Sequence, residues 1–246
     1  MAFVAVGALL ASATIASIAL QRREKDRGAA RSAQGEEREL PPAPLLRGAL
    51  SSVRTEDALE LRDPSGRTVL EALPDAFVRE AGTLHQAPVV EVVEKACQDP
   101  CNAHTRLVAW REGAAVVVLD AEGTVKLEDL DRDGIPEALL DHRMDGTAET
   151  VTLPLAYDGD RFFGEYRRFP EGVDRQLEAL SRAAEIDCDD SVSTGCQADL
   201  RAILGLSAFR GADLGRVIAA LRVGEHARGW ARTQEEAVES EVAALK

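Results

Sequence analysis

The chain has few aromatic side chains and few lysines. Phe, Trp and Tyr together make up 4% of the 246 residues, and only four of the 29 basic residues are lysine. Acidic residues number 43, which gives a net charge of −14. An acidic surface repels a phosphate backbone, and so few aromatic rings form a poor platform for stacked bases. The composition therefore argues against nucleic acid as a partner.

The signatures of common enzyme chemistry are also missing. The sequence contains no Gly-rich phosphate loop, no nucleophile elbow and no H-E-x-x-H helix. Glu149 and Glu165 offer a paired acid and base for glycoside hydrolysis, but any acidic chain contains such pairs. We therefore expect a non-enzymatic protein that acts by binding or as a structural component. An exported hydrolase acting on a cell-surface polymer, with paired carboxylates, is the alternative.

Long hydrophobic runs are absent except at the N-terminus, where residues 1–20 carry no charged side chain. A helix of about 20 apolar residues crosses a bilayer, so this segment is expected to be a transmembrane anchor or a signal peptide cleaved near Ser17-Ile18-Ala19. Residues 21–50 predict a Pro/charge-rich linker. Basic residues follow the apolar segment and none precedes it, which by the positive-inside rule would hold the body in the cytoplasm.

The hydrophobic share of 45% is enough for a folded body. Residues 51–172 contain short β-branched runs, such as Val89–Val93, separated by turn signals at Glu112-Gly113 and Asp158-Gly159. These runs predict a small antiparallel β meander. Within it, the spacing of Leu70, Leu73 and Phe77 predicts a helix over residues 68–81.

Residues 173–232 change to apolar spacings of three and four, which predict a short helical domain containing two cysteines. One such stripe consists of Leu214, Val217, Ile218 and Leu221. Residues 233–246 are expected to be a polar, frayed helical tail. The predicted fold class is thus α+β: an antiparallel β meander domain followed by a short helical domain, with an N-terminal membrane helix.

The four cysteines fall in two clusters, Cys97 with Cys101 and Cys188 with Cys196. An even number behind an export-like segment favours disulfides and an oxidising compartment, with the pairing left open. Free thiols are one alternative. A zinc site of four thiolates is another, although its usual gaps of two residues differ from the gaps of three and seven here.

The most informative stretch runs from Asp129 to Glu137. Asp129, Asp131 and Asp133 alternate, Gly134 permits a sharp turn, and Glu137 closes the run. This spacing lets a loop wrap a hard cation such as Ca²⁺ in oxygen ligands, because the carboxylates converge as the chain curls. Without an ion these carboxylates repel one another. A solvated acidic turn with no bound ion is the alternative.

The segment Lys126–Leu140 resembles the calcium loop of FG-GAP and VCBS-type repeats, found in integrin-like propellers and many exported bacterial proteins. Their pattern is an apolar strand, then D-x-D-x-D-G-x-x-E/D, then another apolar strand. The resemblance implies Ca²⁺ ligation by Asp129, Asp131, Asp133, Glu137 and the carbonyl of Ile135. An EF-hand fits less well, because Leu140 takes the place of its closing glutamate. A propeller needs several copies, so we expect one isolated hairpin of this type.

Other candidate sites are weaker. His85, His104 and His142 could converge on a zinc ion or a catalytic centre, although scattered histidines more often lie on a surface. Asp187, Asp189, Asp190 and Ser191 could form a second cation site, with a solvated loop as the simpler interpretation.

The arginine- and alanine-rich composition is typical of a bacterium with a GC-rich genome. Weighing the cysteines and the acidic loop above the charge rule, we expect an envelope protein, periplasmic or extracellular. It would be anchored by residues 1–20 or secreted, would bind Ca²⁺, and would act on an unknown envelope protein or glycan.

Overall fold

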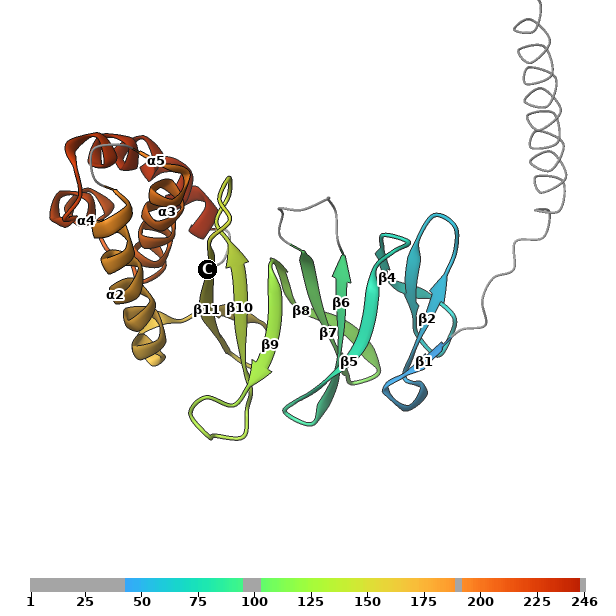
Figure 1. Cartoon of the computed structure of the whole chain (residues 1–246). Helices are drawn as coiled ribbons and strands as arrows, with labels where there is room; N and C mark the ends of the chain where they lie inside the picture. Colours follow the sequence, from blue (N-terminus) through green and yellow to red (C-terminus); the bar gives the residue numbers. More distant parts are fainter. Residues whose placement is uncertain (1–42, 95–102, 189–191, 244–246) are drawn as a thin grey trace, which may run out of the picture. The chain divides into compact units, whose positions relative to one another are not determined.

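The computed structural model describes residues 43–94, 103–188 and 192–243 (Figure 1). Antiparallel β-sheets come first and α-helices follow, which confirms the predicted α+β class. The expected membrane segment at residues 1–20 and the cysteines Cys97 and Cys101 lie outside the described residues. No helix in the described ranges is both long enough and apolar enough to cross a bilayer.

In the described residues, twelve strands form three four-stranded sheets, each an antiparallel meander of consecutive strands. The first sheet comprises β1 (Ala43–Leu45), β2 (Leu50–Arg54), β3 (Leu59–Arg62) and β4 (Thr68–Ala72). The second comprises β5 (Phe77–Leu84), β6 (Ala87–Glu94), β7 (His104–Arg111) and β8 (Ala114–Glu122). The third comprises β9 (Thr124–Glu128), β10 (Glu137–Arg143), β11 (Thr150–Tyr157) and β12 (Phe162–Gly164). Four-stranded meanders of this kind are the unit from which β-propellers are built.

The two central strands of the second sheet, β6 and β7, are buried on both faces. Val89 packs into the core that contains the third sheet, whereas its neighbour Val90 packs into the core shared with the first sheet. Both side chains are 0% exposed. This double burial explains why valines occupy neighbouring positions on both sides of Glu91 in β6, rather than alternating with polar residues.

Gly123 joins the second sheet to the third. Its φ of +137° is accessible to glycine and strained for other residues. A Cβ at this position would lie 2.6 Å from the carbonyl oxygen of Asp141 in β10. Thr105 in β7 donates its hydroxyl to the Gly123 carbonyl at 2.6 Å. The link between the sheets is therefore set by a close approach of two backbones.

The helical segment begins directly after the third sheet. A short 3₁₀ helix, η2 (Tyr166–Arg168), leads into α2 (Pro170–Asp187), α3 (Thr194–Phe209), α4 (Leu214–Ala220) and α5 (Glu225–Ala243). Helix α3 is buried over most of its length, as expected of a helix surrounded by others. The main hydrophobic core runs through the second and third sheets and helices α2 to α5, so the two expected domains share one core.

Helix α2 also supplies hydrogen-bond partners to backbone groups at an open edge of the third sheet. Strand β12 pairs with β11 only from Leu155 to Tyr157. Further along β11, Gln176 of α2 donates to the carbonyl of Thr152 at 2.9 Å and accepts from its N–H at 2.8 Å. The side-chain amide thus replaces a missing strand and ties the helices to the sheet.

Three expectations about element boundaries were wrong. Residues 68–81 form β4 and β5 rather than a helix, because Pro74 cannot continue a helix and Leu61 pairs with Leu70 across the sheet. Strand β1 lies inside the expected linker. The expected polar helical tail is helical up to Ala243, but it is the end of α5 rather than a frayed segment, because Val238 and Val242 are buried in the core.

Replacement of Gly123 by alanine tests the junction between the sheets. We expect Gly123→Ala to lower the free energy of unfolding by at least about 3 kcal/mol, from left-handed strain and a backbone clash together. Gly113→Ala is the control, because its φ is +81° but no atom lies within 4 Å of the added Cβ; its cost should stay near 1–2 kcal/mol. Equal losses in chemical denaturation would show that the close approach to β10 has no energetic importance.

Candidate functional site

The acidic loop is the turn of the β9–β10 hairpin. Glu128 and Glu137 pair across the base of the hairpin, and the chain between them curls back on itself. Arg132 and Gly134 provide the bend with φ values of +64° and +85°. Glycine adopts this conformation freely, so Gly134 serves the role that the sequence assigned to it.

Backbone N–H groups are held by the loop's own carboxylates. Asp129 accepts from the N–H of Gly134 at 3.0 Å, and Asp133 accepts from that of Ile135 at 2.8 Å. Asp131 accepts from the N–H of Asp133 at 3.2 Å. Each carboxylate uses one oxygen in this way, and the bonds fix the curl of the loop.

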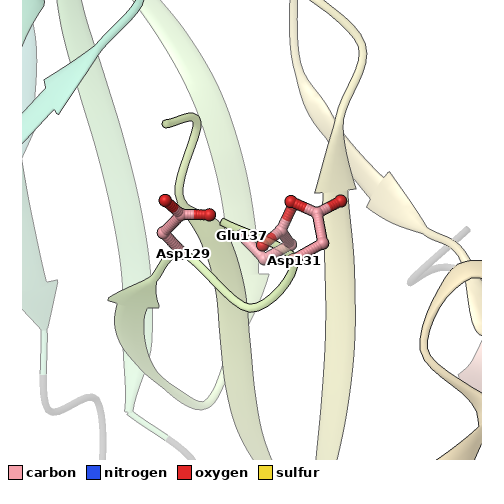
Figure 2. Close-up of side chains that lie close together, drawn as sticks. All are labelled: Asp129, Asp131 and Glu137. Atoms are coloured by element: carbon pink, nitrogen blue, oxygen red, sulfur yellow. The ribbon is translucent and has the colours of Figure 1, made fainter. Parts of the chain in front are cut away.

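Three of the carboxylates converge. Asp129, Asp131 and Glu137 each present an oxygen, and these three oxygens lie within 4.8 Å of one another. Figure 2 shows the three side chains gathered at the bend. Calcium sits about 2.3–2.6 Å from its oxygen ligands, so one ion can reach all three oxygens. Asp133 stands outside this group, and Ile135 packs its side chain against the core.

Glu137 is the buried member of the cluster, with 1% of its surface exposed. Its Oε2 accepts from the N–H of Leu130 at 2.8 Å. Burial raises the pKa of Glu137, and the nearby Asp131 and Asp133 carboxylates add to the rise. The Oε1 atom faces the guanidinium of Arg168 at 3.7 Å, beyond hydrogen-bond distance. The Glu137 carboxylate therefore has one backbone hydrogen bond and one longer ion pair with Arg168.

Arg168 is the residue that the sequence did not reveal. Its Nε donates to Asp131 Oδ2 at 2.9 Å, its Nη2 donates to the same oxygen, and Nη2 also donates to Asp133 Oδ2 at 2.8 Å. These bonds hold the pKa of Asp131 below its ordinary value. One guanidinium thus supplies positive charge to the acidic loop from the connector that precedes α2.

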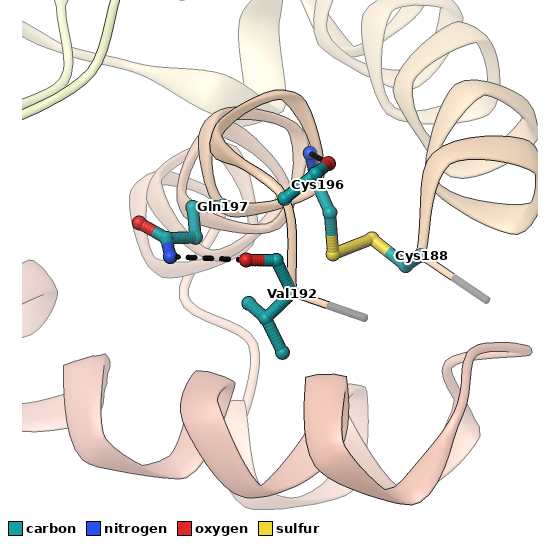
Figure 3. The surroundings of a disulfide bond; sticks show 5 residues. Cys188, Val192, Cys196 and Gln197 are labelled. Atoms are coloured by element: carbon teal, nitrogen blue, oxygen red, sulfur yellow. Dashed lines mark hydrogen bonds between the residues drawn. A yellow bond between two sulfur atoms is a disulfide. The ribbon is translucent and has the colours of Figure 1, made fainter. Parts of the chain in front are cut away.

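The second cysteine cluster forms a disulfide between Cys188 and Cys196, with 4.9 Å between the Cα atoms (Figure 3). It joins the end of α2 to the first turn of α3 and is buried in the main core. Gln197 in the first turn of α3 donates to the carbonyl of Val192 in the preceding loop at 3.4 Å. A zinc site of four thiolates is inconsistent with this bond.

The predicted histidines separate into two places. His104 and His142 line one cavity of about 450 Å³, together with Asp120, Asp145 and Glu241. His85 lies in the β5–β6 turn against the ring of Tyr157. In the cavity, His104 lies between Glu94 and Asp120. Both ring nitrogens of His104 therefore already have carboxylate partners.

His142 connects β10 to α5. It is 2% exposed, its Nδ1 contacts the carbonyl of Glu122 at 2.8 Å, and its Nε2 contacts Glu241 at 2.8 Å. Glu241 also accepts from Arg201 of α3 at 3.0 Å. Burial opposes protonation of His142, but Glu241, the Glu122 carbonyl and Asp145 outweigh it and raise the pKa of His142. The geometry is that of a structural ion pair.

The remaining sequence candidates do not assemble into a site in the described residues. Asp187 lies at the end of α2, while Asp189, Asp190 and Ser191 fall outside the described residues. Glu165 accepts from the N–H of Arg167 at 3.1 Å in η2. Glu149 precedes β11, and no described hydrogen bond or ion pair joins it to Glu165.

The raised pKa of His142 predicts a pH-dependent stability. A raised pKa stabilises the fold below the unfolded value of about 6.5, and this contribution is lost as pH rises through the folded-state pKa. His142→Gln should therefore cost about 2 kcal/mol at pH 5.5 and clearly less at pH 8.5. Denaturation at both pH values measures this, with the exposed His226→Gln as control. A cost independent of pH would contradict the ion pair.

Comparisons with known proteins supply no family for the chain. No protein-family model matches it, and neither the search of curated proteins nor the search of solved structures found a match.

Proposed function

We propose that the protein is a non-enzymatic binding or structural component of a bacterial envelope whose β sheets carry a Ca²⁺ site at Asp129, Asp131 and Glu137. The observation that carries this proposal is the convergence of three carboxylate oxygens within 4.8 Å, one of them buried. An ion there would offset the burial of Glu137. Asp133 and the carbonyl of Ile135 would complete the shell after a small movement of the loop.

The position of the loop supports a stabilising role for the ion. The cluster lies at the end of the β9–β10 hairpin, and β10 is a central strand of the third sheet. An ion shared by Asp129 and Glu137 would hold the ends of both strands together. Hard divalent cations prefer such all-oxygen sites, so the proposed ion is calcium rather than zinc.

The proposed location rests on the Cys188–Cys196 disulfide. Disulfides persist in secreted and periplasmic proteins and are rare in the cytosol of most bacteria. Extracellular calcium modules bind with dissociation constants of about 10⁻⁴–10⁻³ M, a range suited to the same compartments. The apolar residues 1–20 are proposed to tether or export the body.

Calcium titration tests the site. At a free Ca²⁺ concentration about 100 times the dissociation constant, the folded state gains about 2.7 kcal/mol, which should raise the melting temperature by about 5–10 °C. Asp131→Asn should abolish the rise while its amide oxygen still accepts from the N–H of Asp133. The control Glu71→Gln removes one exposed negative charge elsewhere and should retain the rise. A melting curve unmoved by millimolar Ca²⁺ would refute the site.

Thiol alkylation tests the compartment. In protein isolated from its native host and unfolded without reductant, Cys188 and Cys196 should resist alkylation until a reductant is added. Mass spectrometry of the peptides that contain the two cysteines measures this directly. Complete labelling before reduction would place the body in a reducing compartment.

A further inference from the structure

Arg168 occupies the same carboxylates that the proposed cation needs. Its guanidinium binds Asp131 through two nitrogens and Asp133 through one. It also faces the buried Oε1 of Glu137. Asp131 and Glu137 are two of the three converging ligands. The arginine thus contacts two of the acids that would bind the cation and one that would join the shell.

A cation and this guanidinium exclude each other. An ion within about 2.5 Å of Asp131 and Glu137 would place two positive charges against the guanidinium. Carboxylate oxygens turned toward an ion would also lose the geometry that binds Nε and Nη2. The arginine side chain is 37% exposed, so it can swing into solvent without unfolding the sheet.

We infer that Arg168 is a built-in competitor that sets the threshold of the cation site and couples the site to the connector before α2. This inference rests on the proposed function. In the ion-free state Arg168 neutralises the loop. Ion binding displaces it, and η2 loses its attachment to the β9–β10 hairpin. The site therefore reports cation concentration to the junction between sheet and helices.

In the described residues, the other polar contacts of the connector lie within it or on the helical side, and Tyr166 packs against the main core. The Phe169 N–H donates to the Tyr166 carbonyl at 3.0 Å, which closes η2 on itself. The Tyr166 hydroxyl bonds to Asp174 in α2 at 3.1 Å, on the helical side. Arg168 also lies against the Phe169 ring, with 5.4 Å from Cζ to the ring centroid. Release of Arg168 would thus loosen η2 toward the sheet and leave its contact with α2.

Competition has a calculable effect on affinity. When the binding-competent state is a fraction of the population, the apparent dissociation constant is the intrinsic value divided by that fraction. If Arg168 occupies the carboxylates in about nine molecules of ten, the apparent dissociation constant for Ca²⁺ is about tenfold higher than the intrinsic one. Removal of the guanidinium should therefore tighten Ca²⁺ binding about tenfold.

The experiment compares Arg168→Gln with Arg167→Gln in the full chain. Both variants remove one positive charge from η2, but only Arg168 contacts the loop among the described ion pairs. Isothermal titration with CaCl₂ measures affinity. Hydrogen–deuterium exchange over residues 165–169 measures the connector. We expect Arg168→Gln to bind Ca²⁺ about tenfold more tightly than wild type, and Arg167→Gln to bind like wild type.

In wild type, Ca²⁺ should speed amide exchange in the connector, whereas Arg168→Gln should exchange rapidly with or without the ion. Equal or weaker Ca²⁺ binding by Arg168→Gln would overturn the competition and leave the cation site standing. Tighter binding with no change in connector exchange would overturn the coupling. If neither wild type nor Arg168→Gln binds Ca²⁺, both this inference and the proposed function fail.

Discussion

The acidic loop must have positive charge next to it, and the structure around the third sheet depends on that requirement. Asp129, Asp131 and Glu137 place oxygens within 4.8 Å of one another at one bend, and Glu137 is buried. Uncompensated carboxylates at this distance repel one another, and a buried one also loses its hydration. The positive charge of Arg168 offsets part of this repulsion and desolvation. A divalent cation would offset more of it, through its higher charge and shorter contacts.

The same arginine explains how the helices are attached. Arg168 stands two residues before the first residue of α2, so neutralising the loop also positions the helical segment. Gln176 binds the open edge of β11, and Glu241 of α5 binds His142 of β10. Three polar side chain contacts therefore surround a shared apolar core. Because hydrogen bonds and ion pairs demand specific geometry while apolar contacts do not, these three set the orientation of helices on the sheet.

The polar contacts between the helical segment and the third sheet differ in the conditions that can break them. The contact between His142 and Glu241 is buried and responds to protonation. The contact between Arg168 and the loop is partly exposed, and it is the contact with which we propose that a cation competes. Burial is the physical reason for the difference, since an exposed guanidinium is readily rehydrated and a buried ion pair is not.

Local chemistry was readable from the amino-acid sequence. The alternating aspartates and Gly134 predicted a curled acidic loop, and the valines of residues 89–93 predicted β6. Glu112-Gly113 predicted a hairpin turn. Each of these features depends on residues a few positions apart.

Contacts between distant segments were decided by tertiary structure alone. Arg168 lies 37 positions after Asp131, and it reaches the loop only because β10, β11 and β12 fold back beside it. Pairing of Leu61 with Leu70 likewise overrode the helical spacing of residues 68–81. Sequence spacing determines which groups can meet within one bend. The packing of the whole chain determines which opposite charge lies next to them.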